Sequence, residues 1–359
     1  MDNWAEPDPA DEGALADLIG KLAEGDGPAD AAGVWPAPLW SVAEASGVTR
    51  WSLPRELGGE DCDRPTLLRR YARVAEGSMT AAFILSQHDA GVRRLVAAID
   101  RPVARRWLSA IAEGRAFPTV GISQLTTSRR HGAQAVRAEE VGPGRFRVDG
   151  IIPWVTAAPR ADLLVAGATT DDGRQLLIAL PTDRAGVTVR PPFELAALQA
   201  SCTAEVACQG VQVESEDLLA GPVADVMATT SASGTGGLET SALALGLARA
   251  AIRAIEAQGR DDLADSADAL GADWDRLRDD LLATAGNWPG APTPAAIRAR
   301  ANSLVLRSTQ AFLTARKGTG FLREEAAQRW ARQALFFLVW SCPGPVAGAV
   351  IRDLAGVCS

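Results

Sequence analysis

The spacing of hydrophobic and polar residues changes twice along this chain. From residue 1 to about 116, apolar residues recur every three or four positions, as on one face of an amphipathic helix. From 117 to about 221 they alternate with polar residues, and β-branched residues become frequent, as in strands. Beyond 222 the helical spacing returns. The pattern therefore predicts two helical parts separated by a β part.

Eight segments show helical spacing clearly enough to be predicted as helices. The helix over 101–114 also has Pro102 near its start and Gly114 at its end, the positions that these residues favour in helices. The predicted helices span 15–23, 66–75, 78–99, 101–114, 239–257, 272–285, 295–316 and 323–340.

The β part contains five strand candidates, bounded by Gly, Pro, Asp and Arg. In AEVACQGVQV the alternation slips by one residue at Gly210, which predicts a β-bulge. The candidates are 145–150, 161–169, 175–181, 186–191 and 204–213. We therefore expect an α+β protein with an N-terminal helical domain (1–116), a middle β-barrel or β-sandwich domain (117–221) and a C-terminal four-helix bundle (222–359).

Composition narrows the possible functions. The chain has 359 residues and is 47% hydrophobic, but its net charge is −8, which disfavours binding to nucleic acid. Its N-terminus, MDNWAEPDPADEG, lacks the basic and apolar regions of a signal peptide, and no apolar run approaches the roughly 18 residues of a membrane span. Five cysteines without a CxxC pair and only two histidines predict reduced thiols, a cytoplasmic location and no metal site.

Four motifs follow one another in an order that resembles the acyl-CoA dehydrogenase family. The resemblance runs from about residue 35 to 345. It implies the three-domain fold described above, an FAD cofactor and oxidation of an acyl thioester between Cα and Cβ. The motifs are PRELGG at 54–59, WVT at 154–156, VQVESEDLLAG at 211–221 and LETSALALGLARAAI at 238–252.

The resemblance also implies a flavin site between the β domain and the C-terminal helices. Trp154 would lie against the isoalloxazine, and Thr156 would hydrogen-bond at its edge. Without the family, Trp154 reads as a strand-end core residue and Thr156 as a turn hydroxyl. In SQLTTSRR (123–130), Ser123 replaces a family Thr. Arg129 and Arg130 either hold a pyrophosphate or are solvated surface charges.

The catalytic base departs from the commonest family pattern. Many members carry a Glu at the end of the last core helix, where this chain has Ser341. A subset that includes isovaleryl-CoA dehydrogenase has its Glu on the first C-terminal helix, seven residues before a Gly; Glu239 and Gly246 have this spacing. The resemblance thus implies Glu239 as the base, with its pKa raised by desolvation. From the residues alone, Glu239 is a first-turn acid stabilised by the helix dipole.

Three functions remain open at this point. The first is an FAD-dependent acyl-CoA dehydrogenase-like enzyme that passes electrons to an electron-transfer flavoprotein or to oxygen. The second is a reduced-flavin monooxygenase of the same fold, which needs no Glu base and works with a flavin reductase. The third is a non-catalytic binding or assembly subunit, because the family's Arg-x-x-Phe-Gly is reduced to Arg260. The family further implies a homodimer or homotetramer.

Overall fold

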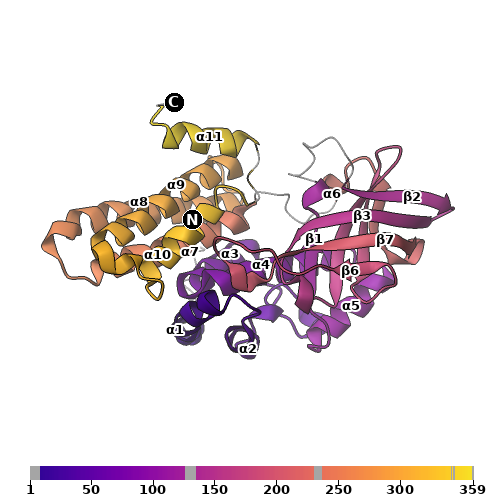
Figure 1. Cartoon of the computed structure of the whole chain (residues 1–359), viewed down its shortest axis with the longest axis horizontal. Helices are drawn as coiled ribbons and strands as arrows, with labels where there is room; N and C mark the ends of the chain where they lie inside the picture. Colours follow the sequence, from indigo (N-terminus) through magenta and orange to yellow (C-terminus); the bar gives the residue numbers. More distant parts are fainter. Residues whose placement is uncertain (1–8, 126–134, 230–236, 341, 343, 358–359) are drawn as a thin grey trace.

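A computed structural model of the chain describes residues 9–125, 135–229, 237–340, 342 and 344–357. Its N-terminal part is helical, as predicted (Figure 1). Side chains cap two of these helices, since Asp63 accepts a hydrogen bond from the Thr66 N–H and Ser78 accepts one from the Ala81 N–H. The helices are α1 (Pro9–Ala32), α2 (Ala37–Ala45), α3 (Arg64–Gly77), α4 (Met79–Ala97) and α5 (Pro102–Ala112).

The middle part forms one mixed β-sheet. Seven strands follow the order β6-β7-β3-β2-β4-β5-β8, and β1 pairs with β4 in parallel. The bulge predicted at Gly210 is confirmed, because the register of β3 and β7 shifts there and Gly210 has a φ of 62°. The strands are β1 (Pro118–Gly121), β2 (Val136–Gly142), β3 (Arg145–Val155), β4 (Leu163–Thr170), β5 (Gln175–Pro181), β6 (Val187–Val189), β7 (Ala204–Glu214) and β8 (Leu218–Val223).

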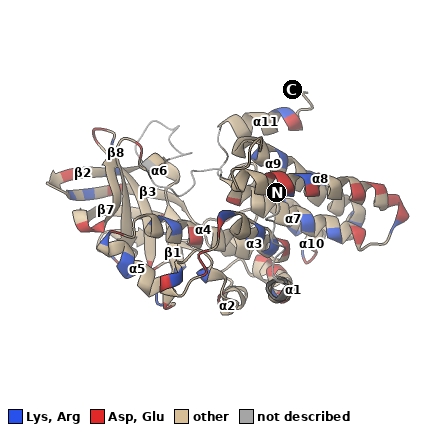
Figure 2. Ribbon diagram, turned by 180° about the vertical axis from the view of Figure 1, so that it is seen from behind, with Lys and Arg blue, Asp and Glu red and all other residues tan. Residues whose placement is uncertain are grey.

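The C-terminal part is again helical, and α7, α8, α9 and α10 lie side by side at the other end of the molecule from the sheet, whereas the short α6 lies beside the sheet (Figure 1). Helix α7 is the central one and packs against α3, α8 and α9. Charged residues of both signs follow α8 (Figure 2), which matches its exposed outer surface. The helices are α6 (Val226–Thr229), α7 (Leu238–Glu256), α8 (Asp261–Ala285), α9 (Pro294–Arg316), α10 (Ala326–Phe336) and α11 (Gly344–Leu354).

The last predicted helix, 323–340, ends earlier in the structure than the sequence pattern predicts, so this boundary is wrong. Helix α10 stops at Phe336, where the fully buried Arg298 donates from Nη2 to the carbonyls of Phe337 (3.1 Å) and Trp340 (2.8 Å). These bonds satisfy carbonyl groups that the ending helix leaves without partners. The chain then begins α11, with Pro345 in its first turn, a position that proline tolerates well.

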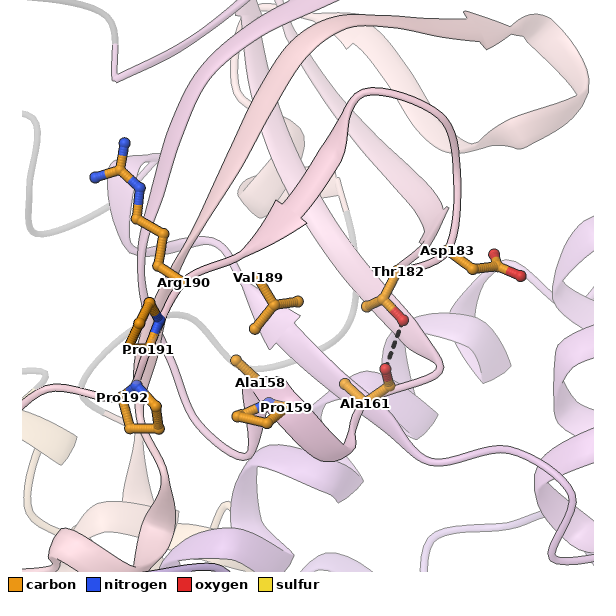
Figure 3. Close-up of a pocket in the computed structure, with 9 residues that line it drawn as sticks. All are labelled: Ala158, Pro159, Ala161, Thr182, Asp183, Val189, Arg190, Pro191 and Pro192. Carbon is orange, nitrogen blue, oxygen red and sulfur yellow. Dashed lines mark hydrogen bonds between the residues drawn. The ribbon is translucent and has the colours of Figure 1, made fainter.

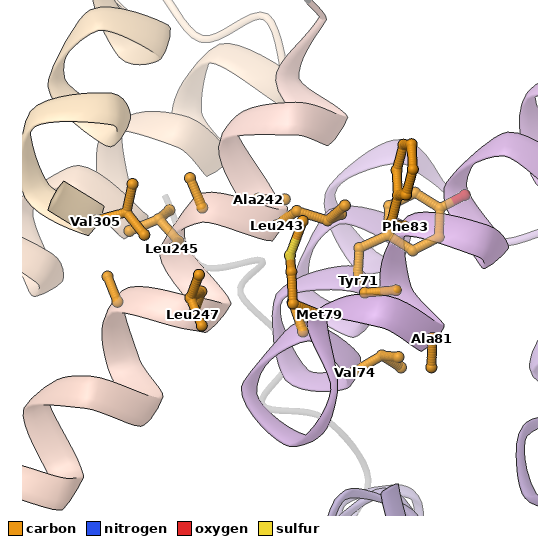
Figure 4. Close-up of a cluster of buried hydrophobic side chains, with 14 of the residues drawn as sticks. Tyr71, Val74, Met79, Ala81, Phe83, Ala242, Leu243, Leu245, Leu247 and Val305 are labelled. Carbon is orange, nitrogen blue, oxygen red and sulfur yellow. The ribbon is translucent and has the colours of Figure 1, made fainter. Parts of the chain in front are cut away.

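One apolar core joins the two helical parts. Side chains of α3, α4, α7 and α9 meet in it, among them Tyr71, Met79, Leu243 and Val305 (Figure 4). Helices α3 and α7 approach closely at Gly246, where a Cβ atom would lie 2.1 Å from the Ala72 carbonyl oxygen. The glycine therefore permits a backbone contact that any side chain would prevent.

One buried and one partly buried ion pair also connect α1 with α10. Arg329 of α10 donates from Nε to Asp26 of α1 at 2.9 Å, and Asp26 also accepts from the Ser78 hydroxyl. Nearby, Arg332 reaches Asp30 at 2.6 Å. Arg329 and Asp26 are almost wholly buried, so α10 is tied to the first helix of the chain. No helix within the described ranges is long and apolar enough to cross a membrane.

Candidate active site

The end of β3 carries an unusual backbone. Its pairing with β7 shifts between Ile152 and Val155, and Trp154 in this irregular stretch has a φ of 57°. A left-handed conformation is unfavourable for a bulky side chain and is found where the surrounding structure enforces it, commonly at functional sites. The indole is 56% exposed and packs on Phe193, with ring centroids 4.8 Å apart. The chain thus presents an aromatic face to solvent at a strained position.

Two other predicted residues adjoin Trp154. Ser123 follows β1 and donates from Oγ to the Pro153 carbonyl at 3.2 Å. Thr156 is buried; its carbonyl accepts from Thr119 Oγ1 at 2.9 Å, and its hydroxyl lies 3.5 Å from Thr203 Oγ1. The structure therefore brings Ser123, Trp154 and Thr156 together where β1 contacts the end of β3. The Thr156 hydroxyl faces the protein interior in this arrangement.

Three residues singled out from the sequence cannot be placed. Arg129, Arg130 and Ser341 lie outside the described residues. Arg260, the remnant of the family's Arg-x-x-Phe-Gly, donates to the Ala315 carbonyl and pairs with Asp262 on the neighbouring turn. Its described contacts are therefore within the C-terminal helices.

Glu239 lies in the first turn of α7, with 14% of its side chain exposed. Its Oε1 atom is 3.5 Å from Nη2 of Arg93 on α4 and 4.0 Å from Nη2 of Arg64 on α3. Two guanidinium groups and the helix N-terminus all favour the ionised carboxylate. These ion pairs join Glu239 to α3 and α4, whereas the hydrogen bonds of Ser123 and Thr156 described above lie within the β part.

Helix α4 lies between these two groups of residues. It packs on β1 at Gly91, where a Cβ atom would be 3.3 Å from Pro118 Cβ. Two positions later on the same helix, Arg93 reaches Glu239. The helix that supports β1 therefore also carries the charge partner of the predicted base.

Sequence reasoning missed a buried polar network behind Arg93. Arg93 donates from Nη1 to the Tyr71 hydroxyl at 3.1 Å, and that hydroxyl donates to Asp89 Oδ2 at 2.7 Å. Asp89 is fully buried and also accepts from Ser52 Oγ at 2.9 Å, while its Oδ1 lies 2.9 Å from His88 Nδ1. The only sequence signal was the run of polar residues in the otherwise apolar helix 78–99.

Burial and charge fix the protonation states in this network. Burial and the neighbouring Asp89 carboxylate raise the pKa of Tyr71, so its hydroxyl stays protonated. Burial opposes the charge on Arg93, but Tyr71, Glu239 and Asp89 outweigh it and raise its pKa. Burial and the adjacent Arg93 lower the pKa of Arg94 to about 10. Near neutral pH, Arg93 is therefore a cation held between Tyr71 and Glu239.

A surface hollow of about 540 Å³ lies beyond the end of β3 (Figure 3). Thr182 donates from Oγ1 to the Ala161 carbonyl at one side of it. None of the described predicted site residues lines this hollow, which is wide open, so we place the candidate site at Trp154 instead. The lining residues are Ala158, Pro159, Ala161, Thr182, Asp183, Val189, Arg190, Pro191 and Pro192.

Comparison with known proteins agrees with the order of helices and strands. The chain matches 99% of its length to butyryl-CoA dehydrogenase from Megasphaera elsdenii, covering 100% of that structure with a TM-score of 0.82 and 17% identity. The helix–sheet–helix architecture is therefore the acyl-CoA dehydrogenase fold. No family model matches the chain.

Sequence similarity adds to this comparison. The chain is 25% identical over 252 residues to the Bacillus subtilis protein named "Probable acyl-CoA dehydrogenase YngJ", which covers 63% of this chain and 65% of that relative. It is 27% identical over 191 residues to dibenzothiophene monooxygenase from Rhodococcus erythropolis, covering 51% of this chain and 45% of that enzyme. The chain is therefore similar in sequence to acyl-CoA dehydrogenases and to a monooxygenase, and it shares the acyl-CoA dehydrogenase fold. It spans less than two thirds of the length of each of these relatives.

Proposed function

We propose that the protein is a flavin-dependent oxidoreductase that oxidises an acyl thioester between Cα and Cβ, with FAD as its flavin. The observation that carries this proposal is Trp154, an exposed indole at a strained backbone position beside Ser123. A flat aromatic face that is solvent-accessible and rigidly held suits stacking against a conjugated ring. When bound, the flavin would accept the hydride that leaves Cβ.

The cofactor contacts follow from this placement. Trp154 would contact the ring face and Ser123 would lie at the ring edge, whereas the buried Thr156 would reach the ring edge only after its side chain turned away from Thr203. Ser123 already binds the backbone beside Trp154, so it also holds the strand end in place. We include Arg129 and Arg130 as donors to the pyrophosphate of FAD, because two guanidinium groups can each give paired hydrogen bonds to phosphate oxygens.

We assign the removal of the substrate proton to Glu239. The carboxylate would take the proton from Cα while the hydride leaves Cβ, so that a carbon–carbon double bond forms and Glu239 becomes protonated. The nearby Arg93 and Arg64 favour the ionised carboxylate before the reaction. Arg93 and Arg64 would thus keep Glu239 ready to accept a proton, a role that the sequence pattern did not predict.

The test combines cofactor binding with a half-reaction. Purified protein is mixed with FAD or FMN and its visible absorption recorded, and the bound flavin is then titrated without oxygen against butyryl-CoA, isovaleryl-CoA and glutaryl-CoA. Bleaching by one thioester, abolished in Glu239→Gln, is the expected result. Glu256→Gln is the matched control, because Glu256 lies at the other end of α7, near Arg249. Bleaching that persists in Glu239→Gln would remove Glu239 as the base.

A second candidate is a monooxygenase that uses reduced flavin supplied by a reductase. The specific support is the 27% identity to a dibenzothiophene monooxygenase, together with Ser341 at the position of the family's more common Glu. This activity would need externally supplied reduced FMN and oxygen, and Glu239→Gln would not abolish it. Oxygenation of indole or dibenzothiophene under those conditions, without bleaching by thioesters, would favour this candidate.

The remaining parts of the proposal concern partners and location. We propose a cytoplasmic enzyme that passes electrons to an electron-transfer flavoprotein and forms a homodimer or homotetramer through its C-terminal helices. Exposed apolar side chains support such an assembly, with Val339 76% and Ile351 66% exposed. Light scattering coupled to size-exclusion chromatography would measure the assembly, and a monomer at all concentrations would contradict it.

A further inference from the structure

The surroundings of Glu239 are dominated by groups from two other helices. Helix α3 contributes Arg64 and Tyr71, and α4 contributes Asp89, Arg93 and Arg94. Arg276, Arg300, Arg316 and Arg329 of α8, α9 and α10 pair with Asp273, Asp280, Glu325 and Asp26. Residues 230–236, which precede α7 and lie outside the described residues, contain no ionisable side chain in their sequence. Arg93 lies 3.5 Å from Glu239, and Arg64 lies 4.0 Å from it.

Arg93 is itself held at two points. One Nη atom donates to the Tyr71 hydroxyl and the other faces Glu239, so the planar guanidinium spans both groups. The Tyr71 hydroxyl is fixed in turn by the fully buried Asp89, which also accepts from Ser52. A side chain constrained in this way loses little freedom when it orients its partner.

We propose that Arg93 is a positioning residue, held by Tyr71 and Asp89, that keeps the Glu239 carboxylate ionised and directed to one orientation. The proposal rests on the proposed function, in which Glu239 is the base. The role of Arg93 is separate from the catalytic role of Glu239, because Arg93 sets only the ionisation and orientation of that carboxylate. Asp89 and Tyr71 act only through Arg93.

The sign of the effect follows from electrostatics. A guanidinium within about 4–6 Å lowers the pKa of a carboxyl group, by about 1–3 pH units in measured cases. Glu239 is 14% exposed, so solvent screens the interaction only in part. Removal of Arg93 should therefore shift the protonation of Glu239 upward by about one pH unit or more. Removal of the Tyr71 hydroxyl should raise the titration midpoint of Glu239 by a smaller amount, because the Arg93 guanidinium stays charged but loses the hydrogen bond that holds it in place.

The experiment measures Glu239 directly and needs no substrate. Protein labelled with ¹³C at the glutamate carboxyl is titrated by NMR, with the Glu239 signal identified by its loss in Glu239→Gln. The midpoint is compared among wild type, Arg93→Gln, Arg93→Lys and Tyr71→Phe. Arg253→Gln is the matched control. Arg253 is also an arginine of an ion pair, but it lies near the other end of α7 and pairs with Glu76 of α3.

The expected result is a midpoint raised by about one unit or more in Arg93→Gln, largely restored in Arg93→Lys and unchanged in Arg253→Gln. If Arg93→Gln does not fold, Tyr71→Phe keeps the ring in the core and must still raise the midpoint by a smaller amount. An unchanged midpoint in every folded variant overturns the proposal. Failure of the proposed function is recognised separately, by flavin bleaching that survives in Glu239→Gln.

Discussion

Gly246 allows a quantitative test of how closely α3 and α7 pack. In Gly246→Ala the new Cβ would lie 2.1 Å from the Ala72 carbonyl oxygen and 2.7 Å from Ala75 Cβ. Both distances are far below van der Waals contact, and the first involves backbone, so the helices must separate by about 1 Å. Gly271→Ala in α8 makes the same change in a helix interior, and its Cβ would meet no atom within 4 Å.

The magnitude follows from two opposing terms. Replacing Gly by Ala in a helix interior stabilises by about 1 kcal/mol, and this gain applies at both positions. Overpacking a well-packed core costs about 1–3 kcal/mol, and the backbone contact at Gly246 places it at the upper end. We therefore expect Gly246→Ala to lose about 2 kcal/mol of unfolding free energy. Gly271→Ala should gain up to about 1 kcal/mol.

Thermal melts followed by circular dichroism would measure both variants in one buffer. At about 2 °C per kcal/mol for a chain of this length, Gly246→Ala should melt roughly 4 °C below the wild type. Gly271→Ala should melt at the wild-type temperature or slightly above it. If Gly246→Ala were stabilised as much as Gly271→Ala, the close contact of α3 with α7 would be refuted.

Three further predictions address the ion pairs and the candidate site. Asp26→Asn leaves Arg329 buried without its charge partner and should cost about 3–5 kcal/mol in urea denaturation; a loss as small as that of an exposed pair would contradict the buried geometry. Burial opposes ionisation of Asp217, but Arg184 binds its carboxylate and holds its pKa below the ordinary 3.8. The stability lost in Asp217→Asn should therefore be complete above about pH 4 and fade as the pH falls further, and a pH-independent loss would speak against this. Trp154→Gly should raise the melting temperature by relieving the left-handed strain while weakening flavin binding, measured by absorbance after gel filtration; unchanged flavin retention would argue against the stacking role.

Strands β3 to β7 and most of the long helices could be predicted because their signals are local, whereas β1, β2 and β8 were not predicted. The alternation in AEVACQGVQV shows both the strand and the bulge at Gly210, since the side-chain period of a strand is fixed by its geometry. The end of α10 could not be predicted, because Arg298, which caps it, lies 38 residues before Phe336 in the sequence. Helix α11 is absent from the predicted helices, although Pro345 lies in its first turn, where proline favours a helix start.

The sequence predicted which residues belong to the candidate site, but it did not predict how they are arranged in space. The WVT motif indicated where an aromatic side chain would lie, but the left-handed backbone of Trp154 depends on the register of β3 against β7, which is a tertiary property. Likewise, the helical spacing placed Glu239 at the start of α7 but could not show which helix faces it. Arg93 lies 146 residues earlier and meets Glu239 only because α4 packs between β1 and α7.

The ion pairs between α1 and α10 have a consequence for the order in which the protein forms during synthesis. The eight strands that the structure describes all lie within residues 118–223, so the sheet can assemble from one continuous stretch of nascent chain. Helix α1 emerges from the ribosome early, but its buried Asp26 gains its ion-pair partner only when Arg329 has been translated. We therefore expect the N-terminal helices to wait, incompletely packed, for most of the synthesis, and this is the interval in which they would depend most on chaperones.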